Sequence, residues 1–494
     1  MLRYWRTLLL LLAVALPQAS TGQPRAPRQL VRLEITARAP AFNGESFGAA
    51  GSYERIAAVA HMRIDPLAPA NRGIVDLDKA PRDADGLVAY DVDVLILRPR
   101  DGARASRVLL FDVVNRGIKT AGVLNGGSIG LADPVDSGDG LLMSKGVTVL
   151  WAGWQGDVTG PNMIGARFPV ATDHGKPITG RISAEAIFDN LTSNRIALAY
   201  PAASPDQSAA RLTVRAVTGS PERVIPADQW RFDGDRAVVV TRPANMDAGA
   251  IYRFEYVARD PKVMGLGFAV VRDLVSFVRH ADAAQGNPLA DLARAPCPRA
   301  SCDGAVTSAV AMGISQSGRY LRDFLWQGFN RDLAGGRVFD GIMTMVPGAR
   351  RTFTNARFAE PGRFSRQHED HDVPGFGFPY AYATLRDPVT GQTDGILRAC
   401  TATGTCPKVM HFDTGAEFWQ AGASLVGTGG TNRDVPFPPN VRAYMLAGGA
   451  HAPGMTTPAC ALPANPMNYS AVQRALFVAM VDWTLDRTAP PPPR

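Results

Sequence analysis

The sequence has 494 residues, of which 46% are hydrophobic and 20% charged, and its formal net charge is +7 at pH 7. This composition carries no extreme bias and is that of a soluble globular protein. The arginines behind the positive charge are scattered singly, without a basic run or a basic patch interleaved with aromatic residues, so nucleic-acid binding is not expected. The length allows one large α/β domain with additions, or about two to three domains.

The N-terminus is typical of a secretory signal peptide. Arg3 and Arg6 precede a short apolar run, 8–16, and small residues follow it. The run is too short to span a bilayer comfortably, and no cysteine follows that would carry a lipid anchor. Because no twin arginine is present, we expect Sec-type export, cleavage between Ala19 and Gln23, and a periplasmic or secreted protein without a membrane span.

The chain is predicted to fold in five parts. A signal peptide (1–22) is followed by a β-rich N-terminal region (23–104), in which apolar residues alternate from Val88 to Ile96. We expect this region to be a β layer without chemistry of its own. The other parts are a catalytic α/β domain (105–160 and 261–489), a β-rich insertion (161–260) and a Pro-rich tail (490–494).

Buried parallel strands begin after the N-terminal region. Val108–Val114 is a nearly continuous apolar run that ends in Asn115-Arg116-Gly117, and Val147–Trp151 ends in Gly153-Trp154-Gln155-Gly156-Asp157. Such strands, with loops at their carboxyl ends, are typical of a covered, mostly parallel sheet flanked by helices. The insertion then interrupts the sheet between its fourth strand and the next helix.

The remaining elements continue this pattern to the C-terminus. Helices are expected at Gly265–Ala281, Arg319–Phe329 and Ser470–Leu485, strands at Gly341–Val346, Val409–Phe412 and Val441–Leu446, and a long irregular segment at Arg350–Thr405.

The strand that ends at Gly313 leads into the most informative stretch, Gly313-Ile314-Ser315-Gln316-Ser317. Strand, sharp turn and helix in this order predict a nucleophile elbow with Ser315 at its apex. The turn demands small residues two before and two after the nucleophile, and Gly313 and Ser317 meet this demand. The alternative is an ordinary helix start, with Ser315 or Ser317 as the N-cap.

A base and an acid follow in the order that such a fold requires. His451 comes directly after the last predicted strand, in a loop of small residues, and is the best-placed histidine for the base. Glu417, in the loop after the preceding strand, is the expected acid, and Asp434 is the alternative. Asp413 is still nearly in the strand and points where the sheet dictates. Glu417 could instead mark a helix start or form a salt bridge.

Two backbone amides are expected to stabilise an oxyanion. Gln316 follows the nucleophile directly, and Arg116 lies in the loop after the third strand of the fold, where Gly117 allows close approach. Trp154 and Gln155 end the neighbouring strand and line the cleft or serve as core and turn residues.

The sequence also contains a histidine and acid cluster and five cysteines. His368-Glu369-Asp370-His371-Asp372 lies in a proline- and glycine-rich segment without helical register, so we favour a polar lid over a metal site. Cys297 with Cys302 and Cys400 with Cys406 are close enough in sequence for local disulfides in an oxidising compartment, with Cys460 left over.

The chain resembles a bacterial family of exported α/β-hydrolase-domain proteins. The matching segments are Asn115-Arg116-Gly117, Gly153–Asp157, Ala258–Phe268 with Arg272 and Asp273, Gly313–Arg322, Glu417-Phe418-Trp419 and Gly449-Ala450-His451. The family often has tyrosine at Phe418 and a bulkier polar residue at Ala450, but neither departure removes a catalytic group. The resemblance implies an α/β-hydrolase fold and a triad of Ser315, Glu417 and His451.

The expected function is that of an exported serine hydrolase, which cleaves small-molecule carboxylic esters through an acyl-enzyme without a cofactor. An amidase or peptidase with the same triad is an alternative, because the elbow does not encode the leaving group. A non-catalytic binding protein on a hydrolase fold is an alternative of another class. The physiological substrate and the oligomeric state are not encoded in these motifs.

Overall fold

The structure is a computed structural model that describes residues 30–188, 190–242, 249–363, 375–454, 463 and 465–492. The predicted signal peptide, the cluster from His368 to Asp372, Cys460 and the last two residues of the tail lie outside this part of the chain. Within it, none of the helices combines the length and the apolar character that a membrane crossing requires.

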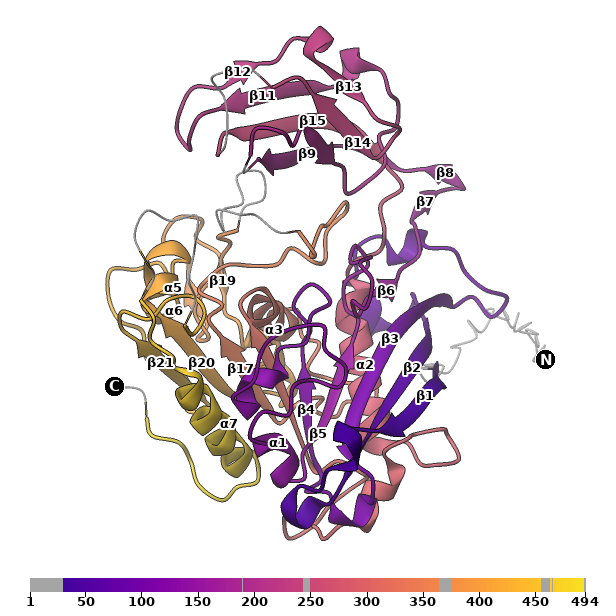
Figure 1. The fold of residues 1–494 in the computed structure, drawn as a ribbon, viewed down its shortest axis with the longest axis vertical. Helices are drawn as coiled ribbons and strands as arrows, with labels where there is room; N and C mark the ends of the chain where they lie inside the picture. The colour runs from indigo at the N-terminus through magenta and orange to yellow at the C-terminus, as the bar shows by residue number, and fades with distance from the viewer. Residues whose placement is uncertain are drawn as a thin grey trace, which may run out of the picture.

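A mixed sheet forms the centre of the fold (Figure 1), with the strand order β1-β2-β3-β5-β4-β16-β17-β20-β21 and with β6 paired to β3. From β5 to β21 neighbouring strands are parallel, whereas β1, β2 and β3 are antiparallel to their neighbours. The bounds are β1 Leu30–Pro40, β2 Tyr53–Ile64, β3 Val88–Pro99, β4 Val108–Asp112, β5 Thr148–Ala152, β6 Ala166–Arg167, β16 Ser308–Ile314, β17 Gly341–Met345, β20 Lys408–Thr414 and β21 Val441–Leu446. The predicted fold class, a mostly parallel α/β sheet, is confirmed.

The N-terminal strands form one edge of this sheet. β2 and β3 pair along their whole length, from Tyr53 opposite Pro99 to Ile64 opposite Val88, and buried residues alternate with less buried ones along most of both strands. The β-rich N-terminal region is present, but its strands extend the central sheet and do not form a layer of their own. Alternation indicates a half-buried strand and does not reveal which sheet the strand joins.

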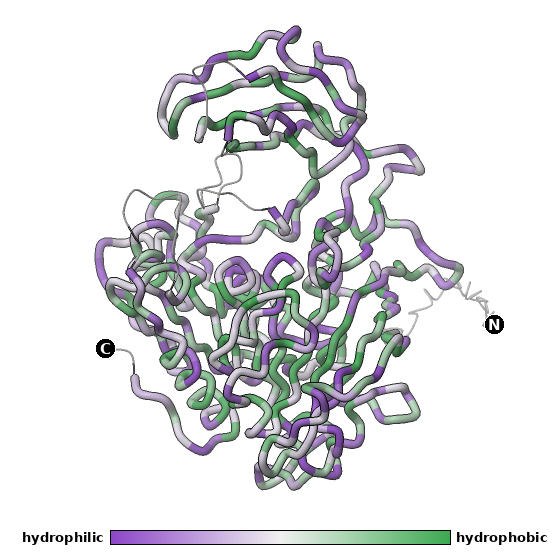
Figure 2. Tube along the Cα trace, in the orientation of Figure 1, coloured by the Kyte–Doolittle hydropathy of each residue, from purple (hydrophilic) through white to green (hydrophobic). Residues whose placement is uncertain are grey.

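Seven α-helices are present among the described residues, and the longest of them cover the central sheet. Every residue of β4, β5, β16 and β17 is buried, which requires cover on both faces of the sheet. Figure 2 shows apolar segments concentrated along these central strands. The helices are α1 Leu141–Ser144, α2 Leu266–His280, α3 Gln316–Trp326, α4 Arg398–Thr403, α5 Gly415–Gln420, α6 Ser424–Thr428 and α7 Ser470–Thr484.

Close packing between helices and strands explains two small residues of the core. α7 approaches β17 so closely that a Cβ atom at Gly341 would lie 2.6 Å from the Met480 sulfur. A Cβ at Gly267, at the start of α2, would lie 2.2 Å from the Trp154 carbonyl oxygen. Of the predicted helices, α2 and α7 agree with their expected ranges to within one residue. α3 begins three residues before the predicted Arg319, because the chain enters it directly from the turn at Ser315.

After β6, which pairs with β3 of the central sheet, the chain forms a separate lobe, the insertion, before it reaches α2. Figure 1 shows this lobe above the central sheet. It contains a four-stranded sheet, β12-β11-β15-β9, and a three-stranded sheet, β10-β14-β13. Aromatic rings from both sheets pack together in its interior, where the ring centroids of Trp230 and Phe254 lie 5.2 Å apart. The bounds are β7 Thr172–Asp173, β8 Lys176–Pro177, β9 Thr179–Ile187, β10 Arg195–Ala197, β11 Arg211–Arg215, β12 Arg223–Val224, β13 Trp230–Phe232, β14 Ala237–Val240 and β15 Ile251–Arg259.

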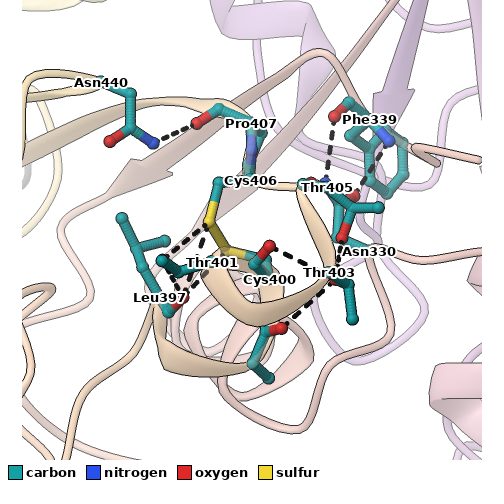
Figure 3. Close-up of a disulfide and its surroundings, with 11 residues drawn as sticks. Asn330, Phe339, Leu397, Cys400, Thr401, Thr403, Thr405, Cys406, Pro407 and Asn440 are labelled. Atoms are coloured by element: carbon teal, nitrogen blue, oxygen red, sulfur yellow. Dashed lines mark hydrogen bonds between the residues drawn. A yellow bond between two sulfur atoms is a disulfide. The ribbon is translucent and has the colours of Figure 1, made fainter.

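The segment between β17 and β20 is mostly irregular, as predicted, and contains α4 and the short strands β18 (Leu385–Arg386) and β19 (Thr393–Asp394). Both expected disulfides are present, Cys297–Cys302 and Cys400–Cys406. Figure 3 shows that the second one ties α4 to the residues that enter β20. Beside it, Asn330 donates a hydrogen bond to the carbonyl of Thr405.

The disulfide at α4 should make a measurable contribution to stability. We expect Cys400→Ala/Cys406→Ala to lower the free energy of unfolding by about 2 kcal/mol, because the bond closes a short loop in the unfolded chain. Cys297→Ala/Cys302→Ala is the matched control, since it opens a loop of similar length and should cost a similar amount. Denaturant unfolding of both variants measures the losses. An unchanged free energy of unfolding in Cys400→Ala/Cys406→Ala, together with a loss of about 2 kcal/mol in Cys297→Ala/Cys302→Ala, would contradict a stabilising role of the α4 disulfide.

Candidate active site

Ser315 lies in a sharp turn between β16 and α3. Its backbone angles are φ 58° and ψ −115°, a conformation that L-residues rarely adopt and that costs on the order of 1–3 kcal/mol. The turn is tight on both sides, because a Cβ at Gly313 would lie 2.3 Å from the Ser317 carbonyl oxygen and one at Gly318 would lie 2.9 Å from that of Gly313. Small residues are therefore required at these positions, and the predicted strand-turn-helix geometry is present.

Ser317 has a role that a glycine would not fill. Its side chain is fully buried, and its Oγ accepts a hydrogen bond from the Ile314 amide at 2.8 Å and donates one to the Ile314 carbonyl at 2.9 Å. The hydroxyl thus satisfies two buried backbone groups of the turn itself. Ser315 is the N-cap residue of α3 by position, but its side chain makes no capping hydrogen bond. Ser315 is therefore not an ordinary side-chain cap of α3.

His451 lies between Ser315 and Glu417 and contacts both side chains. Nε2 of His451 lies 2.9 Å from Oγ of Ser315, and Nδ1 of His451 lies 2.5 Å from Oε1 of Glu417. β16 leads to the serine, β20 to the acid and β21 to the histidine, so three strand ends at the same edge of the sheet supply the three groups. A hydroxyl, an imidazole and a carboxylate in this order can pass the hydroxyl proton to the imidazole.

Glu417 also fixes the beginning of α5. Its Oε2 accepts hydrogen bonds from the Thr414 amide at 3.0 Å and from the Thr414 hydroxyl at 2.5 Å. The bond from the amide is one half of a capping box, and in the other half the Thr414 side chain accepts from the Glu417 amide. Glu417 therefore both marks the helix start and contacts the histidine. Its Oε2 binds Thr414 at the start of α5, and its Oε1 binds His451. Glu417 is only 2% exposed, so its surroundings hold the carboxylate in one orientation.

A buried tyrosine, Tyr469, holds the loop of His451 through hydrogen bonds to its backbone. The Tyr469 hydroxyl, directly before α7, lies within hydrogen-bond distance of the carbonyls of His451 (2.9 Å) and Ala450 (3.1 Å). Tyr469 is 2% exposed, and burial raises the pKa of its hydroxyl. The hydroxyl therefore stays protonated as a donor at neutral pH. This support had no signal in the sequence beyond an aromatic residue at the start of a helix.

The structure places the other candidate acids elsewhere. Asp434, the alternative acid, lies on an exposed loop, whereas the Nδ1 atom of His451 faces Glu417. Asp413 is buried within β20, where its Oδ2 lies 2.5 Å from Nε2 of His411. Burial alone would lower the pKa of His411, but the neighbouring Tyr382 oxygen and the Asp413 carboxylate raise it above its usual value. Asp413 is thus committed to a buried pair, as its position inside the strand predicts.

The two residues whose amides are expected to face an oxyanion, Gln316 and Arg116, lie in segments that adjoin the turn of Ser315. Gln316 is the first residue of α3, and the first amides of a helix have no partner within the helix. Arg116 lies in the loop after β4, with φ 51°. Asn115, its neighbour, donates from Nδ2 to the carbonyl of Ile314 at 2.9 Å. This bond joins the loop after β4 to the residue directly before the serine.

A buried carboxylate, Asp112, holds the same loop at its base. Its oxygens accept hydrogen bonds from the Thr120 amide and hydroxyl, the Ala121 amide and the Trp151 indole, at distances from 2.5 to 2.7 Å. The loop that contains Asn115-Arg116-Gly117 is thus closed by one carboxylate. This role of Asp112 was not predicted from the sequence. An acid at the end of an otherwise apolar strand was the signal that could have found it.

The loop after β5 divides into core and site residues. Trp154 is buried, donates to the carbonyl of Val114 at 2.8 Å and packs on the Tyr320 ring at 4.1 Å, so it belongs to the core. Gln155 is buried beside Gln316, with its Nε2 3.4 Å from the Gln316 side-chain oxygen. Gly117 allows close approach of the loop after β5, because a Cβ there would lie 2.7 Å from the Val158 and Met163 side chains.

Asp157, at the end of that loop, has an unusual pKa. Burial raises the pKa of its carboxyl to about 6, against the opposing effects of the Gly362 amide and of the Lys262 and Arg116 charges. The Gly362 amide donates to its Oδ2 at 2.7 Å, while Oδ1 is buried without a hydrogen-bond partner among the described residues. Ionisation of the Asp157 carboxyl group is therefore unfavourable in the folded protein.

Comparison with known proteins identifies one family. A family model described as an alpha/beta hydrolase domain matches residues 200–494, which is more than half of the chain. The matched range contains Ser315, Glu417 and His451. No curated protein matches the chain. Hydrolase activity is implied by this membership.

The raised pKa of Asp157 predicts a specific pH dependence of stability. A carboxyl with a folded pKa near 6 and an ordinary unfolded pKa binds its proton more tightly in the folded state, so its contribution is present below pH 4 and lost as the pH rises through 6. Between pH 4 and 7, the wild type should lose about 2.4 kcal/mol of unfolding free energy relative to Asp157→Asn. Denaturant unfolding of both proteins across this range measures the difference. Parallel stability curves would contradict the raised pKa.

Proposed function

The chain belongs to this family of alpha/beta hydrolase domains, and we propose that it is an exported serine hydrolase that cleaves carboxylic esters through an acyl-enzyme. The observation that carries the proposal is the hydrogen-bonded series from Ser315 Oγ through His451 to Glu417. Its members lie on three different strand ends, and a serine in a strained turn lies at one end of it. Few structural roles would require all of these features together.

Acylation begins at the serine. Ser315 Oγ attacks the ester carbonyl carbon while its proton moves to Nε2 of His451. Glu417 accepts the Nδ1–H of the imidazole and stabilises the imidazolium that forms. The proton then passes from Nε2 to the alcohol oxygen as the ester C–O bond breaks, which leaves the acyl group on Ser315.

The charge that develops on the carbonyl oxygen needs fixed donors. The Gln316 amide, at the amino end of α3, is the first of these donors in our proposal, and the Arg116 amide is the second. Asn115 supports this assignment because its bond to the Ile314 carbonyl keeps the two donor loops together. Removal of one such donor in other hydrolases costs roughly a hundredfold to a thousandfold in kcat.

Deacylation repeats the same steps with water as the nucleophile. His451 takes a proton from the water molecule, which attacks the acyl carbon, and returns it to Ser315 Oγ as the acid product leaves. Side chains and backbone groups of the chain itself carry each of these steps.

Export is the second part of the proposal. The leader residues 1–22 have the composition of a secretory signal peptide. The two disulfides of the described chain support an oxidising compartment, since such bonds are rare in a reducing cytosol. We therefore propose Sec-type export to the periplasm or the medium, and no membrane span in the mature protein.

Kinetics of substituted proteins test the assigned roles. We expect Ser315→Ala and His451→Ala to lower kcat for p-nitrophenyl esters by a factor of about 10⁴ or more. Glu417→Gln should lower it by about 10² to 10⁴, because the neutral amide no longer stabilises the imidazolium. Asp434→Asn is the matched control, and its kcat should stay within about twofold of the wild type.

Other results would overturn the proposal. Turnover that Asp434→Asn abolishes and Glu417→Gln leaves intact would reassign the acid. Faster release of p-nitroaniline from matching anilides than of p-nitrophenol from the esters would make the protein an amidase with the same triad. A folded protein without Ser315-dependent turnover of either series would point to a binding protein on a hydrolase fold.

A further inference from the structure

A short irregular segment, residues 357–363, connects the insertion to the loops around Ser315. We call it the strap. On the side of the insertion, the Tyr200 hydroxyl donates to the Ala359 carbonyl at 2.6 Å, and the Tyr200 ring meets the Phe358 ring at 5.2 Å. β9 passes so close that a Cβ at Gly180 would lie 2.6 Å from the Phe358 ring. The insertion thus holds the first half of the strap.

The second half of the strap is held by the loops after β4 and β5. Gln155 donates to the Pro361 carbonyl at 2.7 Å, and Asp157 accepts from the Gly362 amide at 2.7 Å. Arg116 donates from Nε and Nη2 to the Arg363 carbonyl, at 3.0 and 2.8 Å. These three side chains belong to the Asn115-Arg116-Gly117 and Gly153–Asp157 motifs, and the bonds to the strap give the motifs a structural purpose.

The Arg116 end of the strap matters most for catalysis. Arg116 has φ 51°, which a residue other than glycine adopts only when its surroundings enforce it. Its guanidinium donates two hydrogen bonds to the carbonyl of Arg363 in the strap, and Nη1 donates to Asn115 Oδ1 at 3.0 Å. Displacement of the strap would move this anchor and, with it, the backbone of the loop that faces Ser315.

We propose that Asp157 and Tyr200 are positioning residues of the hydrolase: through the strap they hold Arg116, so the insertion sets the geometry of the oxyanion donors. This inference rests on the proposed function. It assigns to the insertion a part in catalysis rather than stabilisation alone. Neither residue touches the reacting atoms, and both act on backbone groups of the strap.

Four single substitutions separate positioning from stability. Tyr200→Phe and Asp157→Ala should lower kcat by about tenfold, a fraction of the loss when a donor is removed outright, with KM changed less than about threefold. Asp157→Asn keeps an acceptor for the Gly362 amide and should restore most of kcat. Tyr53→Phe is the matched control: its hydroxyl is equally buried and lies within hydrogen-bond distance of the Met143 and Val147 carbonyls, away from the strap. It should leave kcat unchanged.

A double-mutant cycle tests the route through Arg116. Arg116→Ala keeps the backbone amide but removes the anchor, so it should lower kcat about as much as Tyr200→Phe. In the Arg116→Ala background, Tyr200→Phe should have little further effect, because both act on one coupled unit. Full additivity of the two losses would overturn the proposal, and so would an unchanged kcat in Tyr200→Phe and Asp157→Ala.

Hydrogen exchange gives a readout that needs no activity. In a Ser315→Ala background, the amides of Gly362 and of the loop around Arg116 should exchange at least about tenfold faster in Tyr200→Phe and Asp157→Ala than in Tyr53→Phe. Unchanged exchange would overturn the strap itself. Faster exchange in a protein that shows no Ser315-dependent turnover would leave the strap in place, refute the proposed function and thereby remove the catalytic role of the insertion.

Discussion

The arrangement around Ser315 depends on one buried carboxylate, that of Glu417, which forms hydrogen bonds in two directions. One oxygen of Glu417 closes the first turn of α5 on Thr414, and the other meets the imidazole of His451. A carboxylate with almost no solvent exposure must have both oxygens satisfied, so neither bond changes without the other. The direction in which β20 ends is therefore coupled to the orientation of His451, and through it to the hydroxyl of Ser315.

Parallel strands bring these groups together, and loops from distant parts of the chain refine them. β4, β16, β17, β20 and β21 are consecutive neighbours, so their carboxyl ends lie along one edge. Four of these ends supply Arg116, Ser315, Glu417 and His451. The end of β17 leads into the segment that contains the strap. The strap therefore links the loop of Arg116, which Asp112 closes at its base, to the insertion.

The meeting of Ser315, Glu417 and His451 was predictable from the sequence, because each lies in the turn or loop that follows an apolar run. The order expected for such a fold favoured them over their competitors. Bonds to the backbone of remote residues left no such pattern: Gln155 and Asp157 bind the strap roughly two hundred positions away. The joining of β2 and β3 to the central sheet was equally hidden, because alternation indicates a half-buried strand and not its neighbour.

The proposed function requires that Ser315 is a nucleophile activated by His451 and Glu417. Its most direct test is reaction of the folded protein with a fluorophosphonate, followed by peptide mapping of the adduct by mass spectrometry. We expect a single adduct on Ser315, absent in Ser315→Ala and formed far more slowly in His451→Ala. A folded wild-type protein that stays unlabelled, or a label on another residue that survives Ser315→Ala, would contradict it.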